Sequence, residues 1–247
     1  MKGLVKLFWV EFKLYMRQPQ AAFFSLVFPL LLLFMFGSIY GNKPTPFFGG
    51  RGMVDVSAPA YIAIIMGSTG LMSISIVVST YRERGILRRF RATPLRPAAI
   101  IGAQVAVNFL MTLAGTIILV GGARLVYHMQ FNGAVGAVFV GFTLSTLSFF
   151  AIGFVVASLA RTSRVAQIFG MLLYFPNIFL SGATVPKEIF PAAMRSVSKV
   201  FPMTHVVNLM QGLWIGNPWS KHITEVVVLA GFLVVGGIVS AKTFRWE

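Results

Sequence analysis

The sequence comprises 247 residues, of which 57% are hydrophobic and only 11% are charged, and its formal net charge is +15. Because a soluble domain carries roughly 25% charged residues, this composition excludes an ordinary soluble domain and indicates a membrane protein. Lys and Arg that gather at one membrane face produce such a basic excess, so the charge does not point to a nucleic acid as partner.

Residues 1–19 combine apolar and basic side chains at helical spacing. Phe8 and Phe12 can face the membrane while Lys13 and Arg17 remain among the lipid headgroups. We therefore expect an amphipathic interfacial helix at the N-terminus.

Continuously apolar runs follow, and several of them reach the roughly 20 residues that a helix needs to cross a membrane. A transmembrane barrel is disfavoured because its strands would alternate apolar and polar residues. We expect an all-α membrane protein that forms one domain over residues 1–247 with six transmembrane helices. The expected spans cover about 22–40, 58–80, 99–122, 134–159, 165–182 and 222–241.

Lys and Arg are distributed unevenly between the two faces that these spans define. The termini, the segment 81–98 and the turn at 161–164 hold 14 of the 21 Lys and Arg residues. The richer face is expected to be cytoplasmic. This predicts a multi-pass protein of the plasma (inner) membrane with both termini in the cytoplasm.

The segment Tyr81–Pro97, YRERGILRRFRATPLRP, places six arginines between two apolar runs. As a helix, it would carry arginines along one side and Ile86, Leu87 and Phe90 on the adjoining face. The residues alone leave two interpretations open. The arginines could bind anionic lipid and enforce the topology, or the segment could dock into a groove on a partner.

The fifth expected span contains Pro176 and Asn177 in its middle. Proline removes a backbone hydrogen bond and bends a helix, so the pair could form a hinge or could only set the shape of the helix. After it, prolines interrupt a segment that is too polar for a span and too apolar for a free loop. We expect two short helices in the outer leaflet, about 188–200 and 203–215, with Trp214 and Trp219 at the interface.

Candidate chemical sites are few. The chain has no cysteine, no G-x-x-x-x-G-K-[ST] loop and no His, Asp and Glu cluster with metal-ligand spacing, so we expect no cofactor and no catalytic residue in this chain. Glu225 is the single carboxylate near membrane depth, where pairing with Lys221 explains it better than a role in substrate binding or gating. The lack of a central titratable group argues against an ion-driven carrier.

Two segments resemble those of a known family. ERGILRRFRATPL resembles the E-R-x-G-T-L-x-x-L-x-x-T-P-L pattern that follows the second span in permeases of the ABC type-2 transporter family, which includes daunorubicin-resistance permeases. FPNIFLSGATVPKEIFPAAMRSVSKVFPMTHVV resembles the late signature of the same family, F-L-S-G followed by two prolines and P-x-T-x-x-V. Ile86 departs from the usual Thr.

The resemblance implies a coupling helix at 81–94 that docks on a separate ATP-binding subunit. The partner contacts that it implies are Glu83, Arg84, Gly85, Leu87 and Arg88 in the coupling helix, with Glu11 and Arg17 in the N-terminal helix. It also implies a second permease protomer in a homodimer or close heterodimer, two ATP-binding subunits that hold ATP and Mg, and surrounding membrane lipids.

The expected function is therefore export of a hydrophobic or amphipathic substrate, such as a drug, a lipid or a glycan-lipid, powered by the partner ATPase. The alternative is a secondary transporter or channel whose basic loop only sets the topology, and a non-transporting membrane anchor is a third class.

Overall fold

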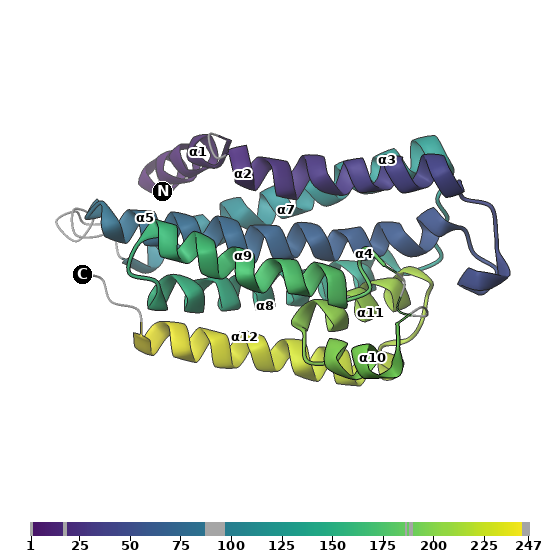
Figure 1. The fold of residues 1–247 in the computed structure, drawn as a ribbon. Helices are drawn as coiled ribbons and strands as arrows, with labels where there is room; N and C mark the ends of the chain where they lie inside the picture. Colours follow the sequence, from purple (N-terminus) through teal and green to yellow (C-terminus); the bar gives the residue numbers. More distant parts are fainter. Residues whose placement is uncertain (1, 17–18, 87–96, 186, 188–189, 244–247) are drawn as a thin grey trace.

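The computed structural model describes residues 2–16, 19–86, 97–185, 187 and 190–243. Within them the chain folds into a bundle of helices without a β-strand, apart from an isolated bridge between Thr45 and Arg51 (Figure 1). The helices are α1 (Lys2–Met16), α2 (Pro19–Ala22), α3 (Phe28–Tyr40), α4 (Met53–Gly67), α5 (Ser75–Glu83), α7 (Pro97–Tyr127), α8 (Val135–Leu159), α9 (Ser163–Leu180), α10 (Ala192–Ser198), α11 (Pro202–Trp214) and α12 (Ile223–Thr243). Two π-helical segments, η1 (Phe23–Val27) and η3 (Ser68–Ile74), and two 3₁₀ turns, η2 (Pro46–Phe48) and η5 (Trp219–His222), complete the described elements.

Five stretches of helix in the described residues are long and apolar enough to cross a membrane: Phe23–Tyr40, Met53–Glu83, Ile101–Tyr127, Val135–Leu159 and Trp219–Thr243. They correspond to the expected first, second, third, fourth and sixth spans. Helix α9 corresponds to the expected fifth span, but Arg164, Gln167 and Asn177 lower its hydropathy, and it is not among the five. A membrane crossing by α9, and with it the count of six, stays a prediction.

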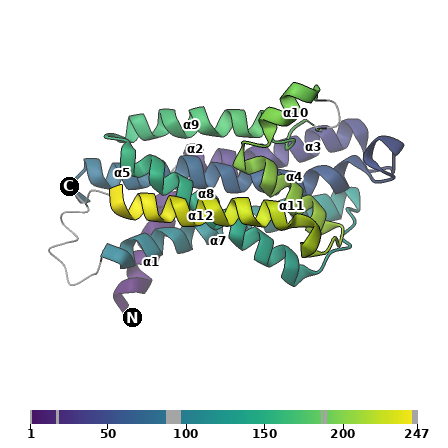
Figure 2. The same cartoon turned by 90° about the horizontal axis from the view of Figure 1, so that it is seen from below.

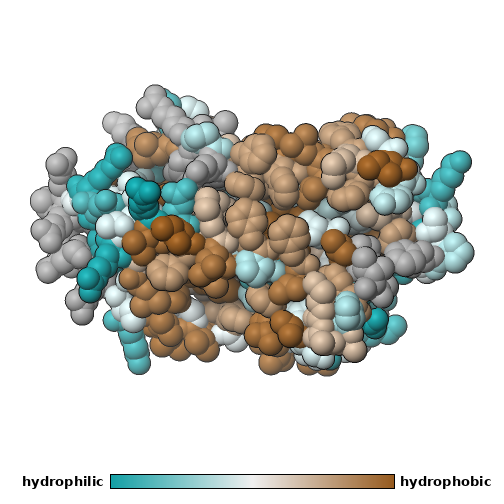
Figure 3. All heavy atoms as spheres, viewed as in Figure 1, coloured by the Kyte–Doolittle hydropathy of each residue, from teal (hydrophilic) through white to brown (hydrophobic). Residues whose placement is uncertain are grey.

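The two ends of the bundle differ in composition from its middle. The start of α1, the end of α5, the start of α7 and the end of α12 lie at one end, and the loop between α3 and α4 lies with α10 and α11 at the other (Figures 1 and 2). The surface in Figure 3 is hydrophobic across the middle and hydrophilic at both ends. This distribution fits a bundle that crosses a membrane along its long axis.

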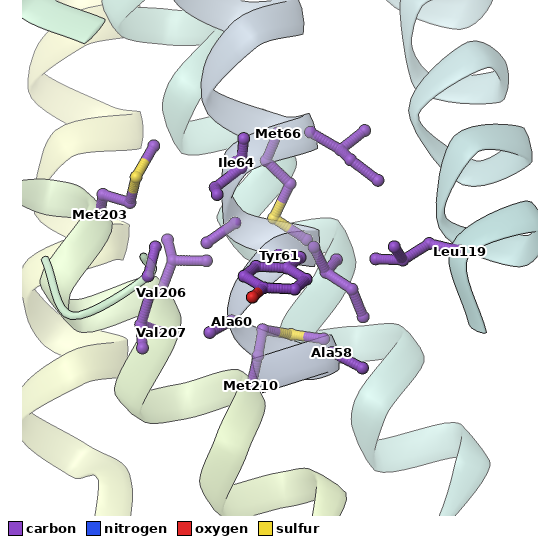
Figure 4. Close-up of a cluster of buried hydrophobic side chains, with 14 of the residues drawn as sticks. Ala58, Ala60, Tyr61, Ile64, Met66, Leu119, Met203, Val206, Val207 and Met210 are labelled. Atoms are coloured by element: carbon purple, nitrogen blue, oxygen red, sulfur yellow. The ribbon is translucent and has the colours of Figure 1, made fainter. Parts of the chain in front are cut away.

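The second span, formed by α4, η3 and α5, is the centre of the fold. In its most apolar stretch 94% of the residues are buried, whereas in that of the last span 11% are buried. Helices surround the second span on every side, which is why it is apolar all round. In Figure 4, Tyr61 of α4, Leu119 of α7 and Met210 of α11 meet in the core, and each is at most 1% exposed.

Glycines allow the backbone of the second span to touch its neighbours. A Cβ atom at Gly153 in α8 would collide with the carbonyl oxygen of Gly70 in η3, and one at Gly170 in α9 would lie 2.5 Å from the carbonyl oxygen of Leu71. The Ser75 hydroxyl donates to the carbonyl oxygen of Gly153 at 3.0 Å. Small residues thus allow close helix contact in lipid, as the sequence indicates.

Two short helices, α10 and α11, lie near the bounds predicted for the external segment. Helix α11 is packed inside the bundle against α4, α8 and α12, and its position in the outer leaflet stays a prediction. Trp214 is 5% exposed, and its indole nitrogen donates to the carbonyl oxygen of Gln130 at 3.2 Å, so its ring packs within the protein. Glu225 accepts a hydrogen bond from Asn208 at 3.3 Å, and no ion pair with Lys221 is present within the described residues.

We predict that Gly153→Ala destabilises the protein by about 1–3 kcal/mol, because the new methyl group meets the backbone of Gly70, which cannot move aside as a side chain can. Gly136→Ala is the matched control in the same helix, since a Cβ atom there has nothing within 4 Å. Thermal unfolding of the purified protein in detergent compares the two variants. Equal midpoints would contradict the close packing of η3 on α8.

Candidate coupling site

The basic segment begins where α5 ends. Tyr81, Arg82 and Glu83 belong to α5, so the coupling helix does not start at 81 as expected. The chain turns at Arg84 and Gly85, where Gly85 adopts a φ of +63°, a conformation that other residues rarely take. Leu87 and Arg88, like most of the expected coupling helix, lie outside the described residues, as does Arg17. Arg84 is exposed and Gly85 is partly buried.

Glu83 connects the end of α5 to the start of α9. Its Oε2 atom accepts hydrogen bonds from the backbone nitrogen of Ser163 at 2.8 Å and from the Ser163 hydroxyl at 2.7 Å. Thr162 caps the same helix, because its hydroxyl oxygen accepts from the backbone nitrogen of Val165 at 3.3 Å. A carboxylate at a helix N-terminus is also favoured by the helix dipole. Glu83 therefore holds α9 in place, although it is exposed at the surface.

Arg82 connects the same end of α5 to the C-terminus of α8. Its guanidinium donates to the carbonyl oxygen of Ser158 at 3.3 Å. The Ser158 hydroxyl forms a 2.8 Å hydrogen bond with the hydroxyl of Thr243, near the end of α12. Two adjacent charged residues of α5 thus bond to two different helices, α8 and α9, and Ser158 extends the connection to α12.

Glu11 of α1 points into the protein. It is 4% exposed, and its Oε2 atom accepts hydrogen bonds from the Tyr81 hydroxyl at 2.6 Å and from the Gln104 amide. The N-terminal helix is therefore attached to both α5 and α7. A direct contact between Glu11 and a partner ATPase stays a prediction, and the structure gives this carboxylate an internal role.

The polar chain continues from Gln104 toward the centre of the bundle. The Asn108 amide nitrogen donates to Gln104 Oε1 at 3.3 Å, and the Ser73 hydroxyl donates to Asn108 Oδ1 at 3.0 Å. All these side chains are buried. Continuous hydrogen bonds therefore run from α1 to the π-helical segment η3 of the second span.

The burial of Glu11 could have been predicted from its position in the sequence. Residues three and four apart share a helix face, so Glu11 lies on the same face as Phe8 and Tyr15. Tyr15 is 3% exposed, and its hydroxyl forms a 2.9 Å hydrogen bond with Ser25. The apolar face of α1 packs against α7, and a carboxylate on that face needs donors from the bundle.

Pro176 and Asn177 lie in an α9 helix that continues through both residues. Asn177 is 3% exposed and donates to the carbonyl oxygen of Leu173 at 2.8 Å. Its Oδ1 atom accepts from the backbone nitrogen of Met203 at 3.1 Å, in the first turn of α11. Asn177 thus links α9 to α11, a contact that sequence reasoning missed, and a hinge at this place stays a prediction.

Burial raises the pKa of Glu11, against hydrogen bonds from Tyr81 and Gln104 that lower it. An acid with a raised pKa in the folded state stabilises the fold when it is protonated. This stabilisation is lost as the pH rises from about the ordinary pKa of 4.5 through the raised pKa.

We predict that Glu11→Gln keeps an acceptor oxygen and removes this pH dependence of stability. Glu11→Ala should cost about 1–3 kcal/mol, since it leaves two buried donors unpaired. Melting curves recorded across pH for the three proteins test this, and equal losses in Gln and Ala would contradict the hydrogen-bond role.

Comparison with known proteins places these features in a family. Residues 3–214 match the family described as ABC-2 type transporter. Nodulation protein J of Rhizobium leguminosarum bv. viciae is 27% identical over 90% of this chain and 85% of its own length. Daunorubicin resistance ABC transporter permease protein DrrB1 of Streptomyces coeruleorubidus is 26% identical over 89% of this chain and 76% of its own length. Inner membrane transport permease YhhJ of Escherichia coli (strain K12) is 22% identical over 82% of this chain, and the match spans 54% of YhhJ.

The described residues contain no group of three or more His, Cys, Asp or Glu side chains that could hold a metal ion. In this family the membrane subunit is a permease, and the ATPase is a separate subunit. The match covers most of the chain and includes the helices that meet at the end of α5. The chain is therefore a multi-pass membrane permease subunit that belongs to the ABC-2 type transporter family.

Proposed function

We propose that this permease is the membrane subunit of an ATP-driven exporter and that the segment after α5 receives the force. The carrying observation is that side chains in the last turn of α5 form hydrogen bonds to three other helices: to α1 through Tyr81, to α8 through Arg82, and to α9 through Glu83. The Glu11 carboxylate that Tyr81 contacts also accepts a hydrogen bond from Gln104 of α7. A displacement of the segment 84–96 would act on all of them together.

The proposed mechanism uses two packed arrangements of one bundle. ATP, bound with Mg by two partner subunits on the cytoplasmic side, would draw those subunits together and tilt the docked segment. The tilt would be transmitted to η3 through the second span itself and to α9 through Glu83. Asn177 would pass the movement of α9 on to α11. In this proposal the chain is one membrane domain with six spans and both termini in the cytoplasm.

A second protomer would pack on the face formed by the first span and α9. Both elements expose large apolar side chains, including Phe34 and Met35 on α3 and Phe169 and Leu172 on α9. Aromatic contacts between Phe24 and Tyr174 hold the two elements together, with ring centroids 5.9 Å apart. This face supplies a wide apolar surface on which a hydrophobic or amphipathic substrate could pass between protomers.

The proposal of outward transport of a drug, lipid or glycan-lipid rests on relatives. One relative carries the words daunorubicin resistance in its name, and removal from the cell is how a permease confers resistance. The described polar network contains no carboxylate at the centre of a span that could bind a driving ion, which disfavours a secondary transporter.

Docking is tested with Leu87→Asp and an ATP-binding protein encoded beside this chain. A charge on the apolar side of the segment should weaken the complex at least about tenfold, because the partner groove would have to bury it. Val200→Asp is the control, since Val200 is 74% exposed and follows directly after α10, which lies at the opposite end of the bundle from the end of α5. Co-purification and titration give the affinity. An unchanged complex with Leu87→Asp would remove the support for docking.

Transmission through Glu83 is tested with Glu83→Ala, Ser163→Ala and the double variant. If the pair transmits the movement, each single change should lower the ATPase rate of the reconstituted complex, by up to ~5-fold, and the double change should add little, because both remove one interaction. Assembly should be unaffected, and Ser196→Ala, on exposed α10, is the control. If Glu83→Ala lowered the ATPase rate and Ser163→Ala left it unchanged, the result would show instead that Glu83 contacts the partner.

A further inference from the structure

A pocket of about 290 Å³ opens between the C-terminal half of α7 and the N-terminal part of α8. Its mouth is formed by exposed Val135 and Phe139 of α8. Its floor is formed by Ile62 of α4 and Met210 of α11, which are fully buried. The pocket thus leads from the membrane-facing surface of α8 to the centre of the fold.

The interior of the pocket offers no free polar group. The Thr116 hydroxyl donates to the carbonyl oxygen of Thr112 at 2.9 Å, and the indole nitrogen of Trp214 donates to the carbonyl oxygen of Gln130 at 3.2 Å. A polar ligand would therefore lose its hydrogen bonds to water without replacement, whereas a hydrocarbon chain would not. The volume lies at the lower end of the roughly 300–1,000 Å³ that is usual for small-molecule sites, which suits a single chain.

Arg124 is the charged residue of the pocket lining. It lies in the last turn of α7, is exposed, and its guanidinium has no hydrogen-bond or ion-pair partner within the described residues. A guanidinium binds phosphate oxygens through paired hydrogen bonds. An apolar pocket with one unpaired guanidinium at the headgroup end of a span is complementary to a molecule with a hydrocarbon tail and an anionic phosphate head.

We propose that this pocket binds one acyl chain of an anionic phospholipid, whose phosphate is held by Arg124. A membrane lipid fits better than a transported substrate because the pocket lies between α7 and α8, and Figure 2 shows α7 on the side of the bundle opposite α9. The bound chain packs against Ile62 and Met210 and so fills the space beside the second span. The site is independent of the ATP-binding partner.

Fluorescence quenching tests the site in the intact permease reconstituted in nanodiscs. Trp9, Trp219 and Trp246 are replaced by Phe, so that Trp214 in the pocket wall is the remaining indole. Phosphatidylglycerol and phosphatidylcholine with brominated acyl chains are compared at equal mole fractions in an unbrominated phosphatidylcholine background. We expect phosphatidylglycerol to quench Trp214 at least about threefold more strongly at low mole fraction, since an Arg near the membrane surface favours an anionic headgroup by ~1 kcal/mol.

Two variants separate the tail from the headgroup. Arg124→Gln should abolish the preference for phosphatidylglycerol, while Arg51→Gln, an exposed arginine at the same end that does not line this pocket, should keep it. Val138→Phe, which adds bulk to the lining, should reduce quenching by both lipids. Equal quenching by the two lipids in the parent protein would overturn the headgroup assignment. The lipid site would be overturned if neither brominated lipid quenched Trp214. It would also be overturned if an apolar compound relieved the quenching and unbrominated phosphatidylglycerol did not.

Discussion

The close approach of Gly70 to Gly153 is the contact on which the rest of the bundle depends. Lipid chains are as apolar as the helices, so the hydrophobic effect does not drive helices together within a membrane, and tight packing has to do so. Without side chains at this contact, the backbone of the second span lies directly against α8, and Gly170 allows α9 to approach the same span closely. The second span can then be enclosed by its neighbours, and movement at either of its ends reaches the other helices.

Buried polar side chains satisfy backbone groups of the second span and join it to its neighbours. Ser68 and Thr69 donate to the carbonyl oxygen of Ile65 at 2.8 and 2.9 Å, and they satisfy a backbone acceptor beside the π-helical turns. Toward the termini, the hydrogen-bonded side chains from Ser73 to Glu11 join three helices. Buried polar groups that are fully hydrogen-bonded give a unique arrangement to surfaces that apolar packing alone would let slide.

Much of the fold could be predicted from the sequence, because the hydrocarbon core imposes long apolar runs whose ends are easily recognised. The predicted spans agree with the five apolar spanning helices to within a few residues at most ends, although Met53 begins the second one earlier than expected. The position of α11 could not be predicted, since its apolar face fits a membrane surface and a protein interior equally well. The internal bonds of Glu11, Glu83 and Asn177 were also beyond sequence reasoning, because each joins residues at least 26 positions apart. Sequence could locate the basic segment, and only coordinates could identify the helices attached to it.

The π-helical segment η3 has a mechanical consequence for the second span. One residue corresponds to about 100° of rotation in an α-helix. If one residue of η3 changed from π-helical to α-helical hydrogen bonding, α5 would therefore rotate about its axis by roughly that angle relative to α4. This rotation would break the hydrogen bonds of Tyr81 to Glu11 and of Glu83 to Ser163 at the same time. Helix α4, with Tyr61, could remain packed on α11. The second span thus consists of two helical segments, α4 and α5, whose relative rotation is set by η3, and η3 contains the glycine that contacts α8.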